Sequence, residues 1–397
     1  MTASLDGPRL ARPDEFRETM ALTNRCFGFE PGGLEERMPH CFDAAHPERH
    51  AIIEANGNIV SHVACVPVEL RAGDARVECG GIAGVATDPN HRGNGYMHRL
   101  LEFWLDRLDD RGVPVAELEG DRVRYGRYGW ENAGREDQYR VTERSFVAAF
   151  GERYADFEAV RRFRPRTDLA LVQRIHESER YRVNRDRRRF ARLLEQTGLE
   201  TLIYDTARPA YLCYRGDNPV SVLEFGGSRD GITALLGQVL DAMADDIVVY
   251  THSRHPLTGL FRTVATDWSQ HPHRKLNVLD LPATLAAYRP LLEERWLNTV
   301  DAFGSTAGDL TFEMVDSTGR SGDTTVATDQ QSTTIMYDAS GVSVKRTDRN
   351  QDVSLGRREM VDLLFGSQDA FRSIKRSEPF LDAVFPVEFY FWQTETI

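Results

Sequence analysis

The sequence has 397 residues and a formal net charge of −12, and 41% of its residues are hydrophobic. This length predicts two or three domains, and the apolar content is sufficient for packed cores. No apolar run reaches about 18 residues, so we expect no membrane-spanning helix, and the acidic balance argues against nucleic acid as a partner.

The basic residues are almost all arginine, because only Lys275, Lys345 and Lys375 are lysines. An acidic, lysine-poor surface fits adaptation to high salt, where ions screen charge repulsion, and it equally fits a high-GC genome. Residues 1–14 are polar and lack the apolar stretch of a secretion signal. We therefore expect a cytoplasmic protein.

The five cysteines show no metal-binding or disulfide pattern. None forms a CxxC pair and their number is odd, in a chain too long to need a disulfide framework. We interpret them as scattered core thiols and expect no metal site. They are Cys26, Cys41, Cys65, Cys79 and Cys213.

The first section, about 1–150, has the pattern of a mixed α/β sheet. A helix is predicted from about residue 13 to residue 27, with Phe16 and Met20 on its apolar face. The apolar runs 51–54 and 59–70 flank an Asn-Gly pair, a strong signal for a β-hairpin. A second turn leads into a third strand over 75–87, so these strands are predicted to be antiparallel.

An amphipathic helix follows over 97–108 and is predicted to end before Gly112. A short strand over 113–118 comes directly after it. A strand, a helix and a strand in this order predict a parallel crossover connection. The apolar positions of the helix are Met97, Leu100, Leu101, Trp104, Leu105 and Leu108.

The middle section, about 151–290, begins with the arginine-rich segment 161–192, which is predicted to be helical with solvated arginines. The strands that follow repeat the order of the first section, but no glycine-rich turn accompanies them. These strands are predicted over 202–204, 209–214, 219–225 and 247–251.

The last section, about 291–397, alternates strands and helices. The aromatic stretch 385–392 near the end predicts a docked segment, because apolar termini are usually buried. Strands are predicted over 309–315, 331–337 and 342–344, and helices over 357–365 and 369–373.

The turn Arg92-Gly93-Asn94-Gly95 lies between the third strand and the amphipathic helix. The first N–H groups of a helix lack intrahelical partners and carry the positive end of its dipole. Glycines let a phosphate approach the backbone closely. The turn therefore predicts a site for a pyrophosphate such as that of coenzyme A, with Arg92 either contacting it or holding the loop.

This turn resembles motif A of the GNAT N-acetyltransferases, in which Arg-x-x-Gly-x-Gly/Ala follows a strand and opens a helix. Arg92 and Gly95 match, while Met97 stands where glycine or alanine is usual. The stretch Tyr125-Gly-Arg-Tyr-Gly-Trp130 resembles a segment of the Eis-type (enhanced intracellular survival) acetyltransferases. That resemblance extends over essentially the whole chain.

The resemblance implies an α+β fold with mixed α/β sheets and three domains. They are an active GNAT domain over 1–150, a degenerate second GNAT domain over 151–290, and a domain similar to sterol carrier proteins over 291–397. The implied cosubstrate is acetyl-CoA, without a metal. The residues implied to bind it are Val85, Ala86 and Thr87 on the strand, Arg92, Gly93, Asn94, Gly95, Tyr96, Met97 and His98 at the turn, and Gly120 and Asp121 beyond the next strand.

The resemblance also implies two catalytic groups. Tyr125 matches the general acid that protonates the departing thiolate, and a phenol with a pKa near 10 suits that task. The general base would be the terminal carboxylate of Ile397, although a tail without a role is the alternative. Competing bases on predicted strands are His62, Glu78 and Glu119.

The predicted function is transfer of an acetyl group from acetyl-CoA to an amine of a cationic small molecule or peptide. The alternative is a catalytically weak protein that binds an acyl-CoA or an apolar ligand. Family resemblance implies a hexamer. The amine pocket is expected along the first helix and the loop after it, with Phe27, Glu30, Glu35, Glu36 and Phe42 as candidates.

Overall fold

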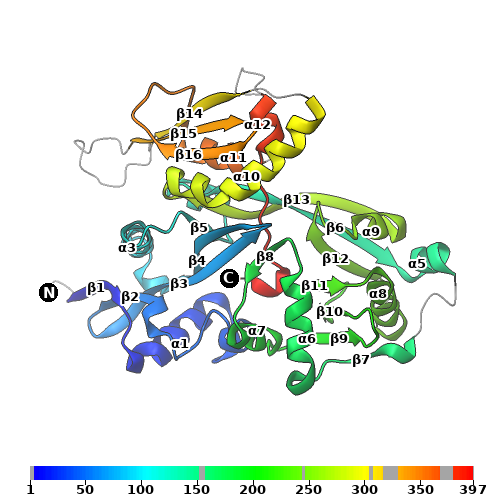
Figure 1. Ribbon diagram of the computed structural model, residues 1–397. Coiled ribbons are helices and arrows are strands. Elements are labelled where there is room, and N and C mark those ends of the chain that lie inside the picture. The colour runs from blue at the N-terminus through cyan, green and yellow to red at the C-terminus, as the bar shows by residue number, and fades with distance from the viewer. Residues whose placement is uncertain are drawn as a thin grey trace.

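A computed structural model describes residues 4–151, 157–243, 246–303, 307–315, 330–366 and 379–396. Within these residues the strands form one sheet of thirteen strands and one of four (Figure 1). The long helix α10, Leu281–Phe303, packs against both sheets. In the described part of the chain, no helix has the length and apolar character that crossing a membrane requires.

The large sheet has the strand order β1-β2-β3-β4-β5-β13-β6-β12-β11-β10-β9-β7, with β8 paired to β3. The small sheet has the order β16-β15-β14-β17. The strands are β1 Leu5–Leu10, β2 His50–Ala55, β3 Asn58–Ala72, β4 Ala75–Thr87, β5 Val115–Leu118, β6 Glu131–Thr142, β7 Val160–Arg162, β8 Tyr181–Asn184, β9 Leu199–Tyr204, β10 Ala210–Arg215, β11 Val220–Gly227, β12 Asp246–His252, β13 Ala265–Val278, β14 Gly308–Val315, β15 Gln330–Asp338, β16 Gly341–Arg346 and β17 Val353–Gly356.

Helices cover both faces of the large sheet. Helix α1 packs on β3 and β4 from the face that carries Met20, and α3 packs on the opposite face through Leu101 and Trp104. The helices besides α10 are α1 Phe16–Phe27, α2 Gly33–Arg37, α3 Tyr96–Asp110, α4 Arg122–Gly126, α5 Glu143–Phe150, α6 Pro165–Glu177, α7 Arg187–Leu194, α8 Arg229–Met243, α9 Thr258–Val264, α11 Arg357–Phe365 and α12 Pro379–Val384.

The elements predicted for the first 118 residues are confirmed. The Asn-Gly pair forms the turn between β2 and β3, with φ of 53° at Asn56 and 79° at Gly57. Both residues therefore adopt the left-handed conformation that a two-residue hairpin turn needs. Strands β4 and β5, which precede and follow α3 in the sequence, are parallel, as the crossover pattern predicts. Gly112, with φ of 68°, follows the end of α3.

Two long strands of the large sheet were not predicted. β6 pairs with β12 and β13, and β13 also pairs with β5. A strand from residues 265–278 thus stands between two strands of the first 142 residues. Both strands are rich in charged and polar residues, and their partners lie more than 100 residues away, so local alternation of apolar residues is weak.

The arginine-rich segment 161–192 begins in strand β7, which was not predicted, and continues as two helices separated by a short strand. Helices α6 and α7 agree with the prediction, whereas β8 between them does not. In β8, Tyr181 and Val183 alternate into the core, and the strand pairs with the end of β3. Tertiary pairing therefore overrides the helical pattern over these four residues.

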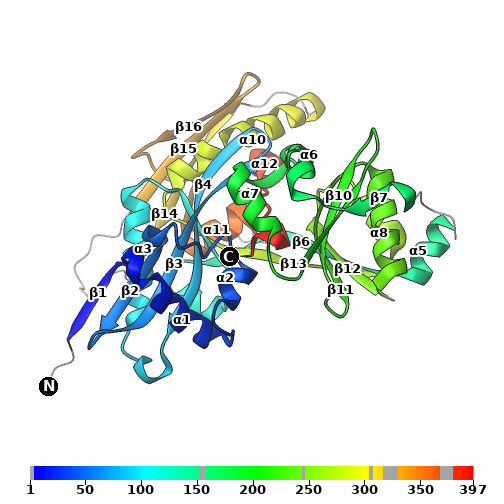
Figure 2. The same cartoon turned by 90° about the horizontal axis from the view of Figure 1, so that it is seen from below.

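In the last section, the strands over 308–315, 330–338 and 341–346 and helix α11 agree with the prediction. The strand β17 was not predicted, and the helix predicted over 369–373 lies outside the described residues. The aromatic stretch Phe385–Trp392 is buried throughout, as expected for a docked segment. It leads from the small sheet into the centre of the molecule (Figure 2).

Candidate functional site

Strands β4 and β5 lie side by side over only four residues each. Their Cα pairs run from Cys79 and Val115 to Ile82 and Leu118, where β5 ends. β4 continues to Thr87, and among the described residues no strand pairs with 83–87 on the side of β5. Backbone groups at such an edge can hydrogen-bond an extended ligand. Val85, Ala86 and Thr87, predicted to bind the cofactor, lie in this edge.

A β-bulge interrupts β4 at the start of this edge. The pairing of β3 and β4 shifts between His62–Ala86 and Ala64–Ala83, so that Gly84 and Val85 both oppose Val63. Gly84 has φ of +58°, and a Cβ there would lie 3.0 Å from a ring carbon of Phe42. Only glycine fits this position, and the bulge turns backbone groups out of the regular ladder.

The glycine turn precedes α3 and is exposed to solvent. Gly93 has φ of +83° and Gly95 has φ of +75°, and no side chain caps the helix. Because the first helical hydrogen bond is that of Arg99, the N–H groups of residues 96–98 have no intrahelical acceptor. Tyr96, Met97 and His98 therefore present three donors at the positive end of a 15-residue helix.

Of the two roles expected for Arg92, the structure shows contact with the loop. Its Nε donates a hydrogen bond to the carbonyl of Thr87 at 3.3 Å, which ties the turn to the end of β4. The Asn94 side chain donates to the carbonyl of His91 at 2.9 Å and closes the turn from within. The turn is therefore held by its own side chains.

Substituting the turn glycines tests its role in cofactor binding. We expect Gly93→Ala and Gly95→Ala to raise the Kd for coenzyme A about tenfold, because a left-handed alanine costs about 1–2 kcal/mol and shifts the turn. Isothermal titration calorimetry measures this. Gly112→Ala is the matched control, since Gly112 has φ of +68° and equally open surroundings at the other end of α3. Equal weakening in all three variants would contradict the assignment.

Tyr125 lies on α4, just beyond the end of β5, and only 6% of its surface is exposed. A Cβ on Gly120 would lie 2.4 Å from the Tyr125 ring, so the glycine makes room for this ring. Asp121 caps α4 by accepting a hydrogen bond from the Arg124 N–H at 2.6 Å. Burial raises the pKa of Tyr125 above its ordinary value, which keeps the phenol protonated.

The C-terminal segment ends close to the β4 bulge. Ile397 lies outside the described residues, but the carbonyl of Thr396 accepts a hydrogen bond from His40 Nε2 at 3.1 Å. The Cys41 thiol also points to this carbonyl, at 3.8 Å. Phe42, the next residue, packs on Gly84 in the bulge. The consecutive residues His40, Cys41 and Phe42 therefore contact Thr396 at one end and the β4 bulge at the other.

The three competing bases occupy different surroundings. His62 is fully buried, with Nδ1 2.9 Å from the Thr23 hydroxyl and Nε2 3.0 Å from His50, and burial holds its pKa well below its usual value. Glu119 forms an ion pair with Arg274. Glu78 is exposed and lines a cavity on the far side of the bulge.

Glu117 on β5 is a titratable group that the sequence reasoning missed. Its side chain is fully buried, and neither carboxylate oxygen has a hydrogen-bond partner among the described residues. The nearest charge is the buried guanidinium of Arg274, at 3.7 Å. Burial raises the pKa of Glu117 to about 7, although Arg274 acts in the opposite direction. A charged residue in a short apolar strand was the available signal.

The raised pKa of Glu117 predicts a pH-dependent stability. Between about pH 4.5 and 7 the folded protein holds a proton that the unfolded chain has lost, so the free energy of unfolding falls as pH rises. We expect Glu117→Gln to abolish this decrease in the free energy of unfolding, which amounts to a few kcal/mol at pH 8. Urea unfolding at pH 5 and pH 8 measures it. Glu78→Gln is the control, because Glu78 is exposed on the neighbouring strand β4. If the free energy of unfolding of Glu117→Gln falls with pH as steeply as that of the wild-type protein, the prediction is contradicted.

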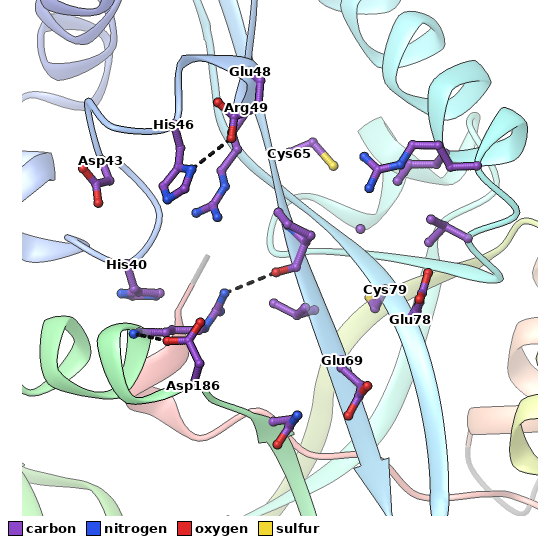
Figure 3. Close-up of a pocket in the computed structure, with 18 of the residues that line it drawn as sticks. His40, Asp43, His46, Glu48, Arg49, Cys65, Glu69, Glu78, Cys79 and Asp186 are labelled. Carbon is purple, nitrogen blue, oxygen red and sulfur yellow. Dashed lines mark hydrogen bonds and ion pairs between the residues drawn. The ribbon is translucent and has the colours of Figure 1, made fainter. Parts of the chain in front are cut away.

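A cavity of about 600 Å³ lies beside β3 (Figure 3). It falls between the part of β3 that pairs with β2 and the part that pairs with β8. His40 lines it and connects it to Thr396. Glu69 and Glu78 stand opposite each other on β3 and β4. Five carboxylates and five arginines line the cavity: Asp43, Glu48, Glu69, Glu78, Asp186, Arg49, Arg111, Arg188, Arg189 and Arg192. The predicted amine-pocket residues do not line it.

One group of described side chains has metal-like spacing. Ligand atoms of Glu179, His252 and His255 lie within 4.8 Å of one another. However, His255 Nδ1 accepts a hydrogen bond from the Leu257 N–H at 3.1 Å, so its proton must be on Nε2. That proton points to Glu179 at 3.4 Å. With its proton on Nε2, His255 faces the Glu179 carboxylate with an N–H and not with the free lone pair that a metal requires.

Comparison with known proteins agrees with this geometry. Residues 8–133 match the family model described as Acetyltransferase (GNAT) domain. The uncharacterized N-acetyltransferase YhbS of Escherichia coli K12 is 32% identical over 81 residues, which are 20% of this chain and 47% of that protein. An uncharacterized N-acetyltransferase of Streptomyces griseus is 30% identical over 178 residues, 42% of this chain and 43% of that protein. The chain thus spans about half the length of the curated relatives it matches.

Solved structures resemble the chain along nearly its whole length. A GCN5-related N-acetyltransferase from Kribbella flavida superposes with a TM-score of 0.72 and 19% identity, covering 99% of this chain and 98% of that one. Eis1 from Mycobacterium abscessus gives a TM-score of 0.66 and 18% identity, covering 98% and 97%. At this identity the likeness shows the fold. Residues 8–133 therefore form a GNAT acetyltransferase domain, and the enzyme class that this domain indicates is that of the acyltransferases.

Proposed function

We propose that the protein is an Eis-type N-acetyltransferase that transfers the acetyl group of acetyl-CoA to an amine. In this proposal residues 1–150 are the active GNAT domain, 151–290 a degenerate second one, and 291–397 a domain similar to sterol carrier proteins. The observation that carries the proposal is the position of Thr396. Its carbonyl contacts His40 and Cys41, the two residues before Phe42, whose ring packs on the β4 bulge.

The cofactor is proposed to extend from the glycine turn along the free edge of β4. The pyrophosphate would accept hydrogen bonds from the N–H groups of residues 96–98. The pantetheine arm would pair with the backbone of Val85, Ala86 and Thr87. This places the thioester between the β4 bulge and the end of β5, where Gly120 and Tyr125 follow. Asp121 acts by capping the helix of Tyr125.

The chemistry is one direct transfer. The amine nitrogen attacks the thioester carbonyl and forms a C–N bond, the C–S bond breaks, and coenzyme A leaves as a thiolate. A base must take a proton from the amine nitrogen, and an acid must give one to the sulfur. Tyr125 supplies the second proton, because its buried phenol stays protonated at neutral pH.

The base is proposed to be the carboxylate of Ile397, which is joined directly to Thr396. Consecutive Cα atoms are about 3.8 Å apart, so the hydrogen bond from His40 to Thr396 limits where the carboxylate can lie. A free α-carboxyl has a pKa of about 3.5. Burial would raise this value and make the group a better proton acceptor.

The acceptor is proposed to be a cationic amine, from a small molecule or a peptide. The net charge of −12 attracts cations over long range. Glu69 and Glu78, opposite each other in the cavity that His40 connects to Thr396, supply local negative charge. The arginines of the same cavity balance much of that charge, so a dispersed polycation fits less well than a single ammonium group.

A direct assay tests the proposal. Protein, acetyl-CoA and a panel of polyamines, aminoglycosides and lysine peptides are mixed, and release of free thiol is followed together with the acetylated product by mass spectrometry. We expect thiol and product in equal amounts with at least one amine. Coenzyme A binding without thiol release across the panel would instead favour the alternative, a binding protein without turnover.

The alternative as an apolar-ligand carrier has weaker support. A cavity of about 610 Å³ beside the small sheet is lined largely by charged and amide side chains, among them Asp280, Arg346 and Gln331.

The protein is also proposed to assemble as a hexamer, by its resemblance to the Eis-type family. Size-exclusion chromatography with light scattering distinguishes a monomer of 45.0 kDa from an assembly six times larger.

A further inference from the structure

The last described residues lie between the first and middle sections of the chain (Figure 2). Gln393–Glu395 form a short 3-10 turn, and Thr394 and Glu395 are fully buried. Their polar partners come largely from the middle section. In that section the turn from strand β11 to helix α8, Gly226-Gly227-Ser228, lacks the Arg-x-x-Gly-x-Gly pattern of the turn before α3. The structure therefore raises the question of what the middle section contributes to the site.

Arg185, in the loop before α7, joins two buried carboxylates. Its Nε donates to Glu395 at 2.8 Å, and its two terminal nitrogens donate to Glu224 on β11 at 2.8 and 3.0 Å. All three side chains are fully inaccessible to solvent. The second carboxylate oxygen of Glu395 accepts the N–H of Trp392 at 3.2 Å, which closes the turn.

Thr394 is held at both its side chain and its backbone. Its hydroxyl donates to Glu224, and its carbonyl accepts a hydrogen bond from the Gln196 side chain at 2.6 Å. Arg215 in turn donates to Gln196. Glu224 therefore contacts both Arg185 and the tail, and the segment is fixed from two directions.

We propose that Arg185, Glu224 and Gln196 are positioning residues that set the register of the tail and so place the terminal carboxylate at the thioester. The inference rests on the proposed function, in which that carboxylate is the base. The middle section would then serve the reaction by holding the base for a cofactor bound to the first section.

The choice of charged partners supports a role in alignment. The aromatic side chains of Tyr390 and Trp392 already anchor the segment by burial. Apolar contacts tolerate sliding, whereas the bidentate pair with Glu224 holds the Arg185 guanidinium in one geometry. The guanidinium held in this way directs its Nε–H to Glu395 of the tail. Buried ion pairs cost desolvation and are a poor means of stabilisation alone, but they can specify one register. A misplacement of about 1 Å at a reacting group can lower a rate about a hundredfold.

Three variants test the proposal in the full-length protein. Glu395→Gln removes one charge without changing size, and Arg185→Lys removes the bidentate pair with Glu224. Gln196→Met removes the bond to Thr394 and the bond from Arg215, and leaves the carboxylates untouched. We expect kcat to fall about ten- to a hundredfold, with the Kd for coenzyme A changed less than about threefold. Arg208→Gln is the control, because Arg208 is 76% exposed in the same section and pairs only loosely with Asp230, at 3.7 Å.

The pH profile separates positioning from general loss of structure. As pH approaches the pKa of the amine, about 10, solvent removes the proton and the base matters less. The deficit of the three variants should therefore shrink between pH 7 and pH 10. A deficit of the same size at every pH, or kcat values equal to the control, overturns the inference.

The outcomes for the two proposals are distinct. If the wild-type protein transfers no acetyl group, the proposed function itself fails. If the wild-type protein and Arg208→Gln are active and the three variants match them, only the positioning role fails. If the charge variants do not fold, Gln196→Met decides, because it leaves both carboxylates paired with Arg185.

Discussion

Extending the chain by two residues beyond Ile397 is expected to lower kcat about a hundred- to ten-thousandfold, the usual contribution of a general base. The extension converts the terminal carboxylate into an uncharged amide, which cannot accept the proton of the amine. The surroundings of Thr396 also oppose extra residues, since His40 and Cys41 beside it are buried. Steady-state kinetics with the best amine of the panel measures the effect.

The control for the extension is the same two residues inserted after Ala339, in the exposed turn between β15 and β16. This insertion should leave kcat unchanged. Coenzyme A affinity should remain within about threefold in both variants, because the cofactor contacts are proposed along β4 and α3. Full turnover in the extended protein would exclude the terminal carboxylate and direct attention to Glu117, whose pKa is raised to about 7.

Tyr125→Phe is expected to lower kcat about a hundredfold, because the thiolate would then leave without a proton donor. The ring itself stays, so its packing against Gly120 and Trp130 is retained. Burial raises the pKa of Tyr125, and an acid acts only below its pKa, so this group should not limit the wild-type rate between pH 7 and pH 10. Stopped-flow detection of thiol release measures the loss.

Tyr128→Phe is the matched control for loss of a hydroxyl in the same turn. Tyr128 is half-buried and its ring lies 5.5 Å from that of His98. We expect its variant to retain kcat within about threefold. Equal losses in the two variants would indicate that the turn as a whole matters, and would contradict a specific acid role for Tyr125.

Several features of this protein follow from local sequence alone. The Asn-Gly turn between β2 and β3 requires two left-handed residues, which this pair adopts at little cost. The periodicity of α3 and the glycine after it determine where that helix ends. The glycine turn is also a local signal, because a strand, the turn and a helix follow one another directly in the sequence, and it lies within the residues that match the GNAT domain model.

Tertiary structure decided the rest, since the partners lie far apart along the chain. β13 enters the sheet beside β5 from about 160 residues away, and no local pattern encodes that pairing. The tetrapeptide β8 is a strand only because β3 offers it an edge. Likewise, Arg185 reads as one more solvated arginine, but folding buries it between Glu224 and Glu395. Buried charges must find partners wherever the chain places them, and that placement is settled only by the complete fold.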